Sequence, residues 1–203
     1  MNINKPNKFI ELIKNRLHIY SAKTFKDGST VFCDYIKKVY YVTGELKSEC
    51  PYTNNKKHGI EKVYCKSGQL SYEVSYKNDV KDGIEKIYYE KSDKLIREIP
   101  YKNGEKHGIE KWYYENGQLI YEWPYKNGKE QGISKEYYEN GQLESECPYE
   151  KGEIHGIEKY YYENGQLEKE IPYENDKIHG TWKEYDETGE LKSETTYVDG
   201  EIL

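Results

Sequence analysis

Hydrophobic and polar residues alternate along most of this chain, and the pattern returns every 24 residues. Each repeat contains a turn that ends in glycine and, further on, a second glycine preceded by a polar residue. The first series is Gly44, Gly68, Gly117, Gly141, Gly165 and Gly189, and the second is Gly59, Gly83, Gly108, Gly132, Gly156 and Gly180. Alternation predicts half-buried β-strands, and a period of this length predicts an array whose repeats bury apolar surface against their neighbours.

The dipeptide Asn116-Gly117 separates two alternating runs and predicts a two-residue type I′ hairpin turn. If Glu115 lies opposite Gln118, the register of both strands is fixed. It places Trp112 opposite Tyr121, Lys111 opposite Glu122, and Ile109 opposite Pro124.

A second two-residue turn is expected at Asn127-Gly128. It places Tyr125 opposite Glu130 and Trp123 opposite Gly132, where the indole ring covers the glycine. Both turns preserve the facing of the strands, so the predicted fold is an all-β repeat protein, an elongated single-layer antiparallel β-meander of about seven hairpin repeats. The loop at residues 91–93 is one residue longer and is expected to change the local twist or to create a bulge.

Side chains on such a sheet alternate between two faces. One predicted face is apolar and contains Trp112, Tyr114, Leu119, Tyr121, Trp123 and Tyr125. The other carries opposite charges that face each other across strands: Lys111 with Glu122, Lys38 with Glu49, Lys62 with Glu73, Lys135 with Glu146, Lys159 with Glu170, and Lys183 with Glu194. Such pairs contribute about 0.2–1 kcal/mol each and disfavour a slipped register.

The two ends of the chain differ from the repeats. Residues 5–18 carry apolar side chains at helical spacing, namely Phe9, Ile10, Ile13 and Leu17, and are predicted to form a short basic amphipathic helix. We divide the chain into an N-terminal cap, residues 1–35, with this helix and a degenerate first hairpin, and a repeat array, residues 36–203. A further hairpin begins at Asp199-Gly200, and this C-terminal sheet edge is a candidate site of self-association.

Composition and charge narrow the class of partner. Only 35% of the residues are hydrophobic, but 24 tyrosines provide amphipathic rings that suit a thin sheet. Residues 1–40 carry eight Lys and Arg against three Asp and Glu, whereas residues 41–203 carry 23 against 34. An acidic array is poorly suited to bind nucleic acid or an anionic membrane. No apolar run approaches the roughly 20 residues that span a bilayer, so we expect a soluble cytoplasmic protein.

The sequence predicts no enzyme, no metal site and no cofactor. His58, His107, His155 and His179 share one repeat position, and neighbouring repeats lie about 9.6 Å apart, too far for a common zinc ion. We therefore assign these histidines to turns. The recurring glutamates face lysines, and a single-layer sheet offers no pocket that separates the pKa values of a catalytic pair. The cysteines, Cys33, Cys50, Cys65 and Cys147, form no CxxC pair and are interpreted as small core hydrophobes.

Residues 119–142 fit the pattern LxxExPYxNGxxHGxxxxYYxNGQ, with Gln131 in place of histidine. This pattern resembles the MORN repeat, and more closely the bacterial MORN-like variant repeats, over about residues 36–200. The resemblance implies a single-layer β-meander without catalytic residues or cofactors that binds proteins or, in some members, lipids. Bacterial relatives include proteins described as antitoxins.

Two surfaces are candidate interaction sites. The first is the aromatic group Trp112, Tyr114, Tyr121 and Trp123, because Trp and Tyr dominate interface hot spots; the alternative is that these residues pack beneath the N-terminal helix. The second is the acidic group Glu144, Glu146, Glu168 and Glu170. This group is either a solvated face or a strip of negative charge for the basic groove of a nucleic-acid enzyme.

Three functions follow from these surfaces. The first is a non-catalytic protein–protein interaction module. The second is an inhibitor, an antitoxin or an anti-CRISPR-like protein of bacterial or phage origin, that blocks a nucleic-acid-processing toxin or a defence nuclease. The third is docking to a membrane surface through the basic N-terminal helix.

Overall fold

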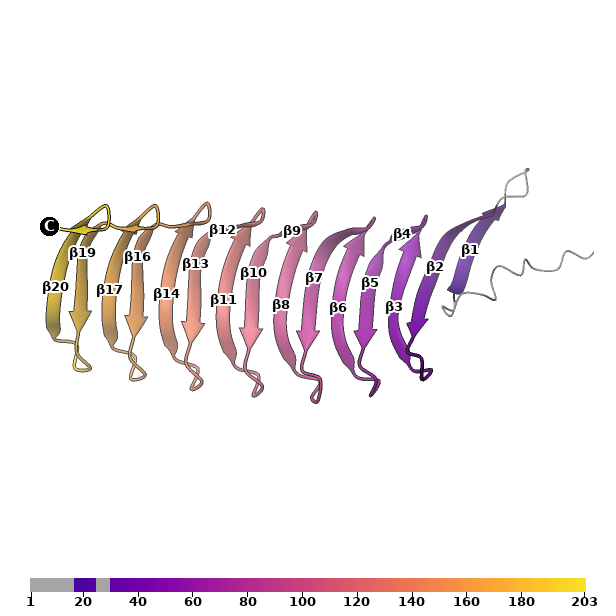
Figure 1. Ribbon diagram of the computed structural model, residues 1–203, viewed down its shortest axis with the longest axis horizontal. Helices are drawn as coiled ribbons and strands as arrows, with labels where there is room; N and C mark the ends of the chain where they lie inside the picture. Colours follow the sequence, from indigo (N-terminus) through magenta and orange to yellow (C-terminus); the bar gives the residue numbers. More distant parts are fainter. Residues whose placement is uncertain (1–16, 25–29) are drawn as a thin grey trace, which may run out of the picture. The chain divides into compact units, whose positions relative to one another are not determined.

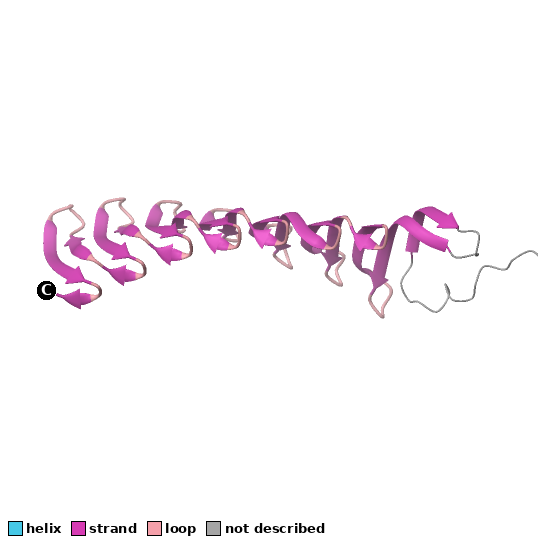
Figure 2. Ribbon diagram, turned by 90° about the horizontal axis from the view of Figure 1, so that it is seen from above, coloured by secondary structure: helices cyan, strands magenta, loops and turns pink. Residues whose placement is uncertain are grey.

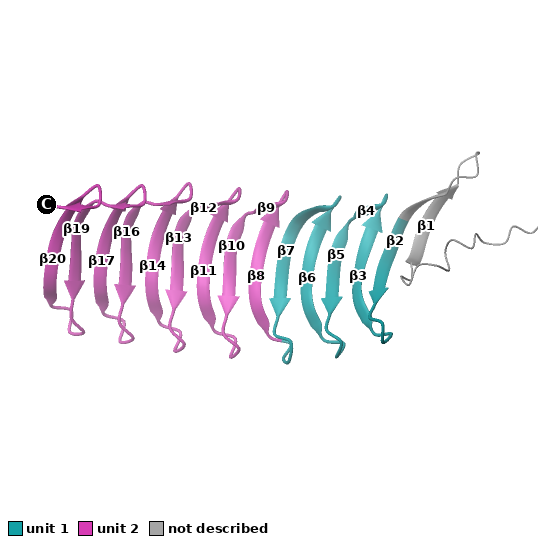
Figure 3. Cartoon of the chain, in the orientation of Figure 1, with its two compact units in different colours: residues 1–93 teal, residues 94–203 magenta. Residues whose placement is uncertain are grey.

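The structure is a computed structural model that describes residues 17–24 and 30–203, with side chains from residue 34 onward. It divides into two compact units, residues 1–93 (unit 1) and residues 94–203 (unit 2) (Figure 3). Every regular element in the described ranges is a β-strand, which confirms the all-β class. The predicted helix, residues 5–18, lies outside the described residues except at its end, where Leu17 and His18 are extended and begin strand β1. Within the described ranges, the structure has no helix that could span a membrane.

Unit 1 is an antiparallel meander. Its strands are β1 (Leu17–Thr24), β2 (Thr30–Tyr40), β3 (Leu46–Thr53), β4 (Lys56–Lys57), β5 (Gly59–Tyr64), β6 (Leu70–Lys77) and β7 (Val80–Tyr88). Strands β1 and β2 form a hairpin, and each later long strand pairs with the long strand before it. The short strand β4 pairs with the end of β3 and completes a tight hairpin.

Unit 2 continues the same scheme (Figure 1). Its long strands are β8 (Leu95–Lys102), β10 (Gly108–Tyr113), β11 (Leu119–Lys126), β13 (Gly132–Tyr137), β14 (Leu143–Glu150), β16 (Gly156–Tyr161), β17 (Leu167–Glu174), β19 (Gly180–Tyr185) and β20 (Leu191–Val198). The two-residue strands between them are β9 (Glu105–Lys106), β12 (Lys129–Glu130), β15 (Glu153–Ile154), β18 (Lys177–Ile178) and β21 (Glu201–Ile202). Seen from above, the strands of unit 2 follow one another in a single layer (Figure 2).

The turn at Asn127-Gly128 is the predicted two-residue turn. Tyr125 pairs with Glu130, and Asn127 and Gly128 have φ values of 52° and 80°. A type I′ turn needs positive φ at both central residues, which asparagine and glycine tolerate best. Successive tight turns are joined by main-chain hydrogen bonds, such as the 2.9 Å bond from the Gly128 N–H to the Lys106 carbonyl.

The turn at Asn116-Gly117 is not the predicted two-residue turn. The Gly117 N–H donates to the Tyr114 carbonyl and the Tyr114 N–H donates to the Gln118 carbonyl, both at 2.8 Å, so the loop has three residues. In this loop φ is positive at Gly117 (94°) and not at Asn116, as in a type I turn followed by a left-handed glycine. A bulge follows, because Tyr113 pairs with Leu119 whereas Trp112 pairs with Tyr121. Beyond the bulge, the predicted register holds.

The predicted pairing of Trp123 with Gly132 is wrong, and so is the covering of that glycine by the indole ring. The register shifts after the tight turn, so that Glu122 pairs with Lys135 and Gly132 pairs with Tyr149. The ring against Gly132 is that of Pro124, whose Cγ lies 3.3 Å from where a β-carbon at residue 132 would lie. Proline therefore fills the space that a side chain on the glycine would need.

The thin core lies on one side of each sheet. Its buried apolar side chains share one repeat position and are Cys50 and Val74 in unit 1 and Ile99, Cys147 and Ile171 in unit 2. Cys50, Cys65 and Cys147 are free thiols, and the first and last of them are buried. Burial raises the pKa of Cys50 to about 11. Cys50 and Cys147 act as small core hydrophobes, as predicted. Cys65 is only half-buried, and the side chain of Cys33 lies outside the described residues.

Candidate functional site

A ladder of alternating lysines and glutamates crosses one face of unit 2, which we call the ladder face. The register gives Glu122 two cross-strand partners, Lys111 and Lys135, so that opposite charges flank it on both sides. In order across the strands the ladder reads Glu98, Lys111, Glu122, Lys135, Glu146, Lys159, Glu170, Lys183 and Glu194. The predicted pair of Lys111 and Glu122 is confirmed, with Nζ and Oε1 3.4 Å apart.

Tyrosine hydroxyls complete the surroundings of the ladder carboxylates. Tyr137 donates a 2.9 Å hydrogen bond to Glu122. Burial, and then this bond and the nearby negative charge, raise the pKa of Tyr137 to about 12. Glu122 therefore accepts a hydrogen bond from a neutral donor and also lies beside a lysine.

The four glutamates predicted as an acidic group occupy two environments. Glu146 and Glu170 lie in the ladder, where Lys159 Nζ is 3.7 Å from Glu146 Oε1. Glu144 and Glu168 lie closer to other carboxylates. Burial, followed by repulsion from Glu136, Glu163 and Glu168, raises the pKa of Glu144. Among the described residues, Glu144 therefore lies in more negative surroundings than Glu146, which has a lysine beside it.

The ladder face also carries a row of half-exposed isoleucines. Ile109 lies opposite Pro124, as predicted, and Ile109, Ile133 and Ile157 are 48–52% exposed. The equivalent residues of unit 1, Ile60 and Ile84, are 46% and 47% exposed. The sequence interpretation described this face by its charges alone. The signal for the row was the isoleucine that directly follows each glycine of the second series, from Gly59 to Gly156.

The opposite face, which we call the aromatic face, brings together three of the predicted site residues. Trp112 pairs with Tyr121, and the ring of Trp123 lies between those of Tyr121 and Tyr149, with centroid distances of 6.3 and 6.4 Å. All are half-buried. Tyr114 belongs to the wide turn instead, where its hydroxyl donates to the Tyr137 carbonyl at 3.4 Å.

A depression of about 130 Å³ lies beside Trp123 on the aromatic face. Its walls include Tyr121 and Glu136 on one side and Tyr149, Glu158 and Tyr160 on the other. The indole Nε1 of Trp123 is buried and has no hydrogen-bond partner among the described residues. The depression therefore offers ring faces and carboxylates together, a combination that suits a cationic or amphipathic side chain.

Glutamates also lie on the aromatic face, and sequence reasoning did not find them. Glu110 is only 3% exposed and accepts hydrogen bonds from Lys106 at 2.7 Å, Trp112 at 2.7 Å and Arg97 at 2.8 Å. Although burial opposes it, these donors hold the pKa of Glu110 below its ordinary value. The Lys106 ammonium also lies 4.4 Å from the centroid of the Tyr125 ring.

We call this arrangement of Lys106, Glu110 and Tyr125 a lysine cage. Unit 1 repeats it, with Lys57 Nζ 2.7 Å from Glu61 and 4.6 Å from the centre of the Tyr76 ring. The sequence signal was a lysine four residues before a glutamate, together with the predicted pairing that places Glu110 opposite Trp123.

Six consecutive segments of the chain match the MORN repeat variant family. They are residues 57–78, 81–103, 106–127, 130–151, 154–175 and 178–199, which together make up more than half of the chain. The chain belongs to the MORN repeat variant family. A comparison with curated proteins gave no match. MORN repeats generally serve as modules for interaction with proteins or membranes and are generally non-catalytic.

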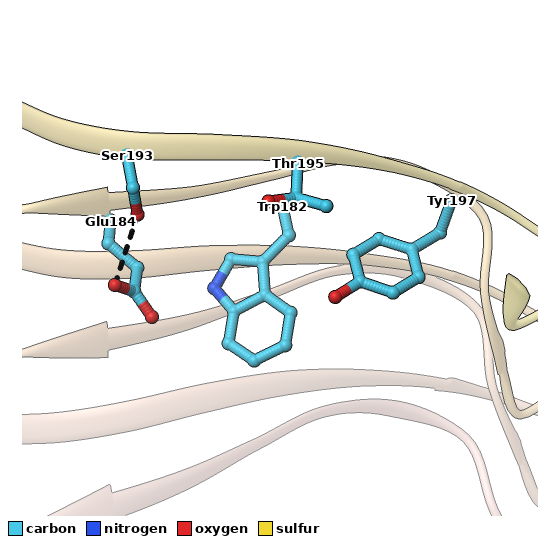
Figure 4. A pocket seen from close by; sticks show the side chains of 5 residues that line it. All are labelled: Trp182, Glu184, Ser193, Thr195 and Tyr197. Atoms are coloured by element: carbon cyan, nitrogen blue, oxygen red, sulfur yellow. Dashed lines mark hydrogen bonds between the residues drawn. The ribbon is translucent and has the colours of Figure 1, made fainter. Parts of the chain in front are cut away.

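The last full MORN repeat replaces the cage with an apolar version (Figure 4). Trp182 occupies the position of Glu110, and its ring stacks on Tyr197 with centroids 6.1 Å apart. Beside it, the Ser193 hydroxyl donates to Glu184 at 3.1 Å. Ile178 occupies the position equivalent to Lys106. The last repeat therefore contains neither the lysine nor the carboxylate of the cage.

The histidines of the MORN repeats lie at the tight turns, as predicted. Nδ1 of His107 is 3.3 Å from the side-chain oxygen of Asn127, and that of His58 is 3.4 Å from Asn78. Each contact joins one turn to the next. Over the described residues, no three His, Cys, Asp or Glu side chains are placed to hold a metal ion.

Proposed function

We propose that this chain is a non-catalytic protein-binding module and that its aromatic face holds the partner. The observation that supports this most directly is the group Tyr121, Trp123 and Tyr149, whose rings border a depression beside an indole N–H without an acceptor. Aromatic side chains in such settings contribute most of the energy in protein interfaces.

The ladder face is a weaker candidate for the main contact. Glu122 and Glu146 each have a lysine and a tyrosine hydroxyl within reach. A partner would have to replace these bonds, and exchanging satisfied charges adds little affinity.

Capture experiments with matched variants test the proposal. The full chain is immobilised as wild type, as Trp112→Ala/Trp123→Ala, and as Ile109→Ala/Ile133→Ala, which removes apolar side chains from the ladder face as a control. We expect a protein that is retained by wild type and control and lost from the tryptophan variant, because each hot-spot truncation costs about 2 kcal/mol or more. Equal retention by all three folded chains would contradict the assignment of the aromatic face.

The same capture experiment extends to the inhibitor hypothesis. A retained toxin or nuclease whose activity falls when the chain is added would support it, and charge reversal at Glu144 and Glu168 would then relieve the inhibition. Membrane docking by residues 5–18 stays a prediction that depends on residues outside the described ranges. Sedimentation with anionic and neutral vesicles at low and high salt tests it.

A further inference from the structure

One glutamate of the aromatic face, Glu158, has the surroundings of a lysine cage except for the lysine. Glu61, Glu85 and Glu110 each pair with the lysine four residues before them. The equivalent residue Glu158 is preceded at that position by Ile154. In the part of the chain that the structure describes, Glu158 forms no ion pair with lysine or arginine.

The remaining parts of the cage are present around Glu158. Tyr160 donates a 2.9 Å hydrogen bond to its Oε1, just as Trp112 donates to Glu110. Tyr173 takes the place of Tyr125; burial, followed by the charge of Glu158, raises the pKa of this tyrosine to about 12. Burial and Glu158 likewise raise the pKa of the Cys147 thiol to about 12. Cys147 and Glu158 line the same depression.

The carboxylate can be reached from solvent. Glu158 is half-buried and forms part of the wall of the depression beside Trp123. The ammonium of Lys169 lies 3.9 Å from the centre of the Tyr160 ring and forms no ion pair with Glu158. No lysine of the described chain therefore contacts Glu158 in the way that Lys106 contacts Glu110, and we call this cage open.

We propose that Glu158 and Tyr173, with Tyr149 and Tyr160 beside them, bind the ammonium group of a lysine side chain from the protein partner. The proposal rests on the proposed function and names the chemistry of its contact.

The chain itself supplies the template for this contact. At Lys57 and Lys106 a carboxylate oxygen lies 2.7 Å from a lysine Nζ and a tyrosine ring lies within 4.6 Å of it. An ammonium group from a partner supplies both the ion pair and the cation–π contact that lysine supplies in these two cages. In the other two described MORN repeats that lack the lysine, this position holds Ser134 and Trp182, so among the described repeats the open carboxylate is specific to that of Glu158.

Binding of a small lysine peptide to the full chain tests the cage. The probe is acetyl-Gly-Lys-Gly-amide, and NMR follows the backbone amides of Glu158 and Tyr173. We expect saturable shifts with wild type and an affinity at least about tenfold lower for Glu158→Gln and for the ε-acetylated peptide. Absence of saturable shifts at these amides in wild type would overturn the proposal.

Two variants use the internal template as controls. Ile154→Lys supplies the missing lysine from within, so it is expected to fold as well as wild type and to lose peptide binding. Lys57→Ile opens the cage at Glu61 and is expected to gain peptide-induced shifts there. Undiminished binding by Ile154→Lys would contradict the cage.

Capture of the partner separates this proposal from the proposed function. Loss of the partner with Trp112→Ala/Trp123→Ala but full retention with both Glu158→Gln and Ile154→Lys would overturn the cage contact and leave the aromatic face as the site. Loss of the partner with Glu158→Gln and Ile154→Lys, under conditions in which Ile109→Ala/Ile133→Ala retains it, would support the cage contact.

Discussion

The hydroxyl of Tyr161 donates a 3.0 Å hydrogen bond to the carboxylate of Glu146, fifteen residues earlier in the chain. Among the described residues the same relationship recurs five times. Tyr64 with Glu49, Tyr88 with Glu73, Tyr113 with Glu98, Tyr137 with Glu122, and Tyr185 with Glu170 complete the series. Because Tyr161 lies on β16 and Glu146 on β14, each bond ties one hairpin to the next. In a protein of this kind, such contacts between neighbours carry the cooperativity of folding.

Removal of one of these hydroxyls should weaken the contact between neighbouring repeats. We expect Tyr161→Phe to lower the free energy of unfolding by about 1.5–3 kcal/mol, since it removes a hydrogen bond to a charged group. Urea denaturation followed by circular dichroism measures the change. Tyr197→Phe is the matched control, because among the described residues the Tyr197 hydroxyl forms no hydrogen bond, and its ring stacks on Trp182. A similar loss in both variants would argue against the bond.

Stability should fall in the alkaline range. Burial, and then the hydrogen bonds to glutamate, raise the pKa of Tyr64, Tyr113 and Tyr161 from 10 to about 12. The folded chain therefore holds these protons more tightly than the unfolded chain, so the stabilisation is complete below pH 10 and is lost as the pH rises from 10 to 12. Urea midpoints at pH 9 and pH 11, with tyrosinate absorbance as the direct readout, measure this. A smaller decline in Tyr161→Phe than in wild type is expected.

The register of β10 and β11 could be predicted because two departures from the expected turn compensate. The loop has three residues and not two, and the bulge at Ile120 restores the pairing of Trp112 with Tyr121. Asn-Gly is compatible with both turn types, so the dipeptide alone does not decide between them. Alternation decided the face of each strand, which is why the ladder pairs were predicted correctly.

The arrangement of the candidate site was harder to predict. A register shift after Glu130 gives Glu122 its second lysine and moves Gly132 from Trp123 to Pro124. Irregularities of this kind depend on tertiary packing and leave no mark in the alternation. To predict the cage of Glu110, one would have to pair it with a lysine four residues earlier, on the other side of a break between two strands. The open cage of Glu158 can be recognised only by comparison with that of Glu110.

Substitution by glycine should affect the two turns to different extents. Asn127 already has a positive φ of 52°, so Asn127→Gly is expected to change stability by only a few tenths of a kcal/mol. Asn116 accepts a 2.8 Å hydrogen bond from the Gln118 N–H, so Asn116→Gly loses that bond and adds freedom to the unfolded chain, a cost of about 1 kcal/mol. Thermal unfolding of the two variants provides the comparison. Equal effects would indicate that both turns are of type I′.

Replacement of Gly108, which lies against Pro100, by alanine should be among the most destabilising small substitutions. Gly108 has a φ of +119°, and a β-carbon there would lie 2.9 Å from Pro100 Cγ, whereas Gly117, with a φ of +94°, has no atom within 4 Å of that point. Both alanine variants strain the backbone by about 1–3 kcal/mol, but only Gly108→Ala also meets a rigid ring.

A double-mutant cycle isolates that contact. We expect Gly108→Ala to lose more stability than Gly117→Ala, and Pro100→Ala to recover part of the difference in the Gly108→Ala background, with a coupling of about 0.5–3 kcal/mol. Urea midpoints of the four chains in the cycle, with Gly117→Ala as the reference for strain alone, give the value. Additive effects of the two substitutions would mean that Pro100 relaxes away from the new side chain, and the proline would then not explain the glycine at this position.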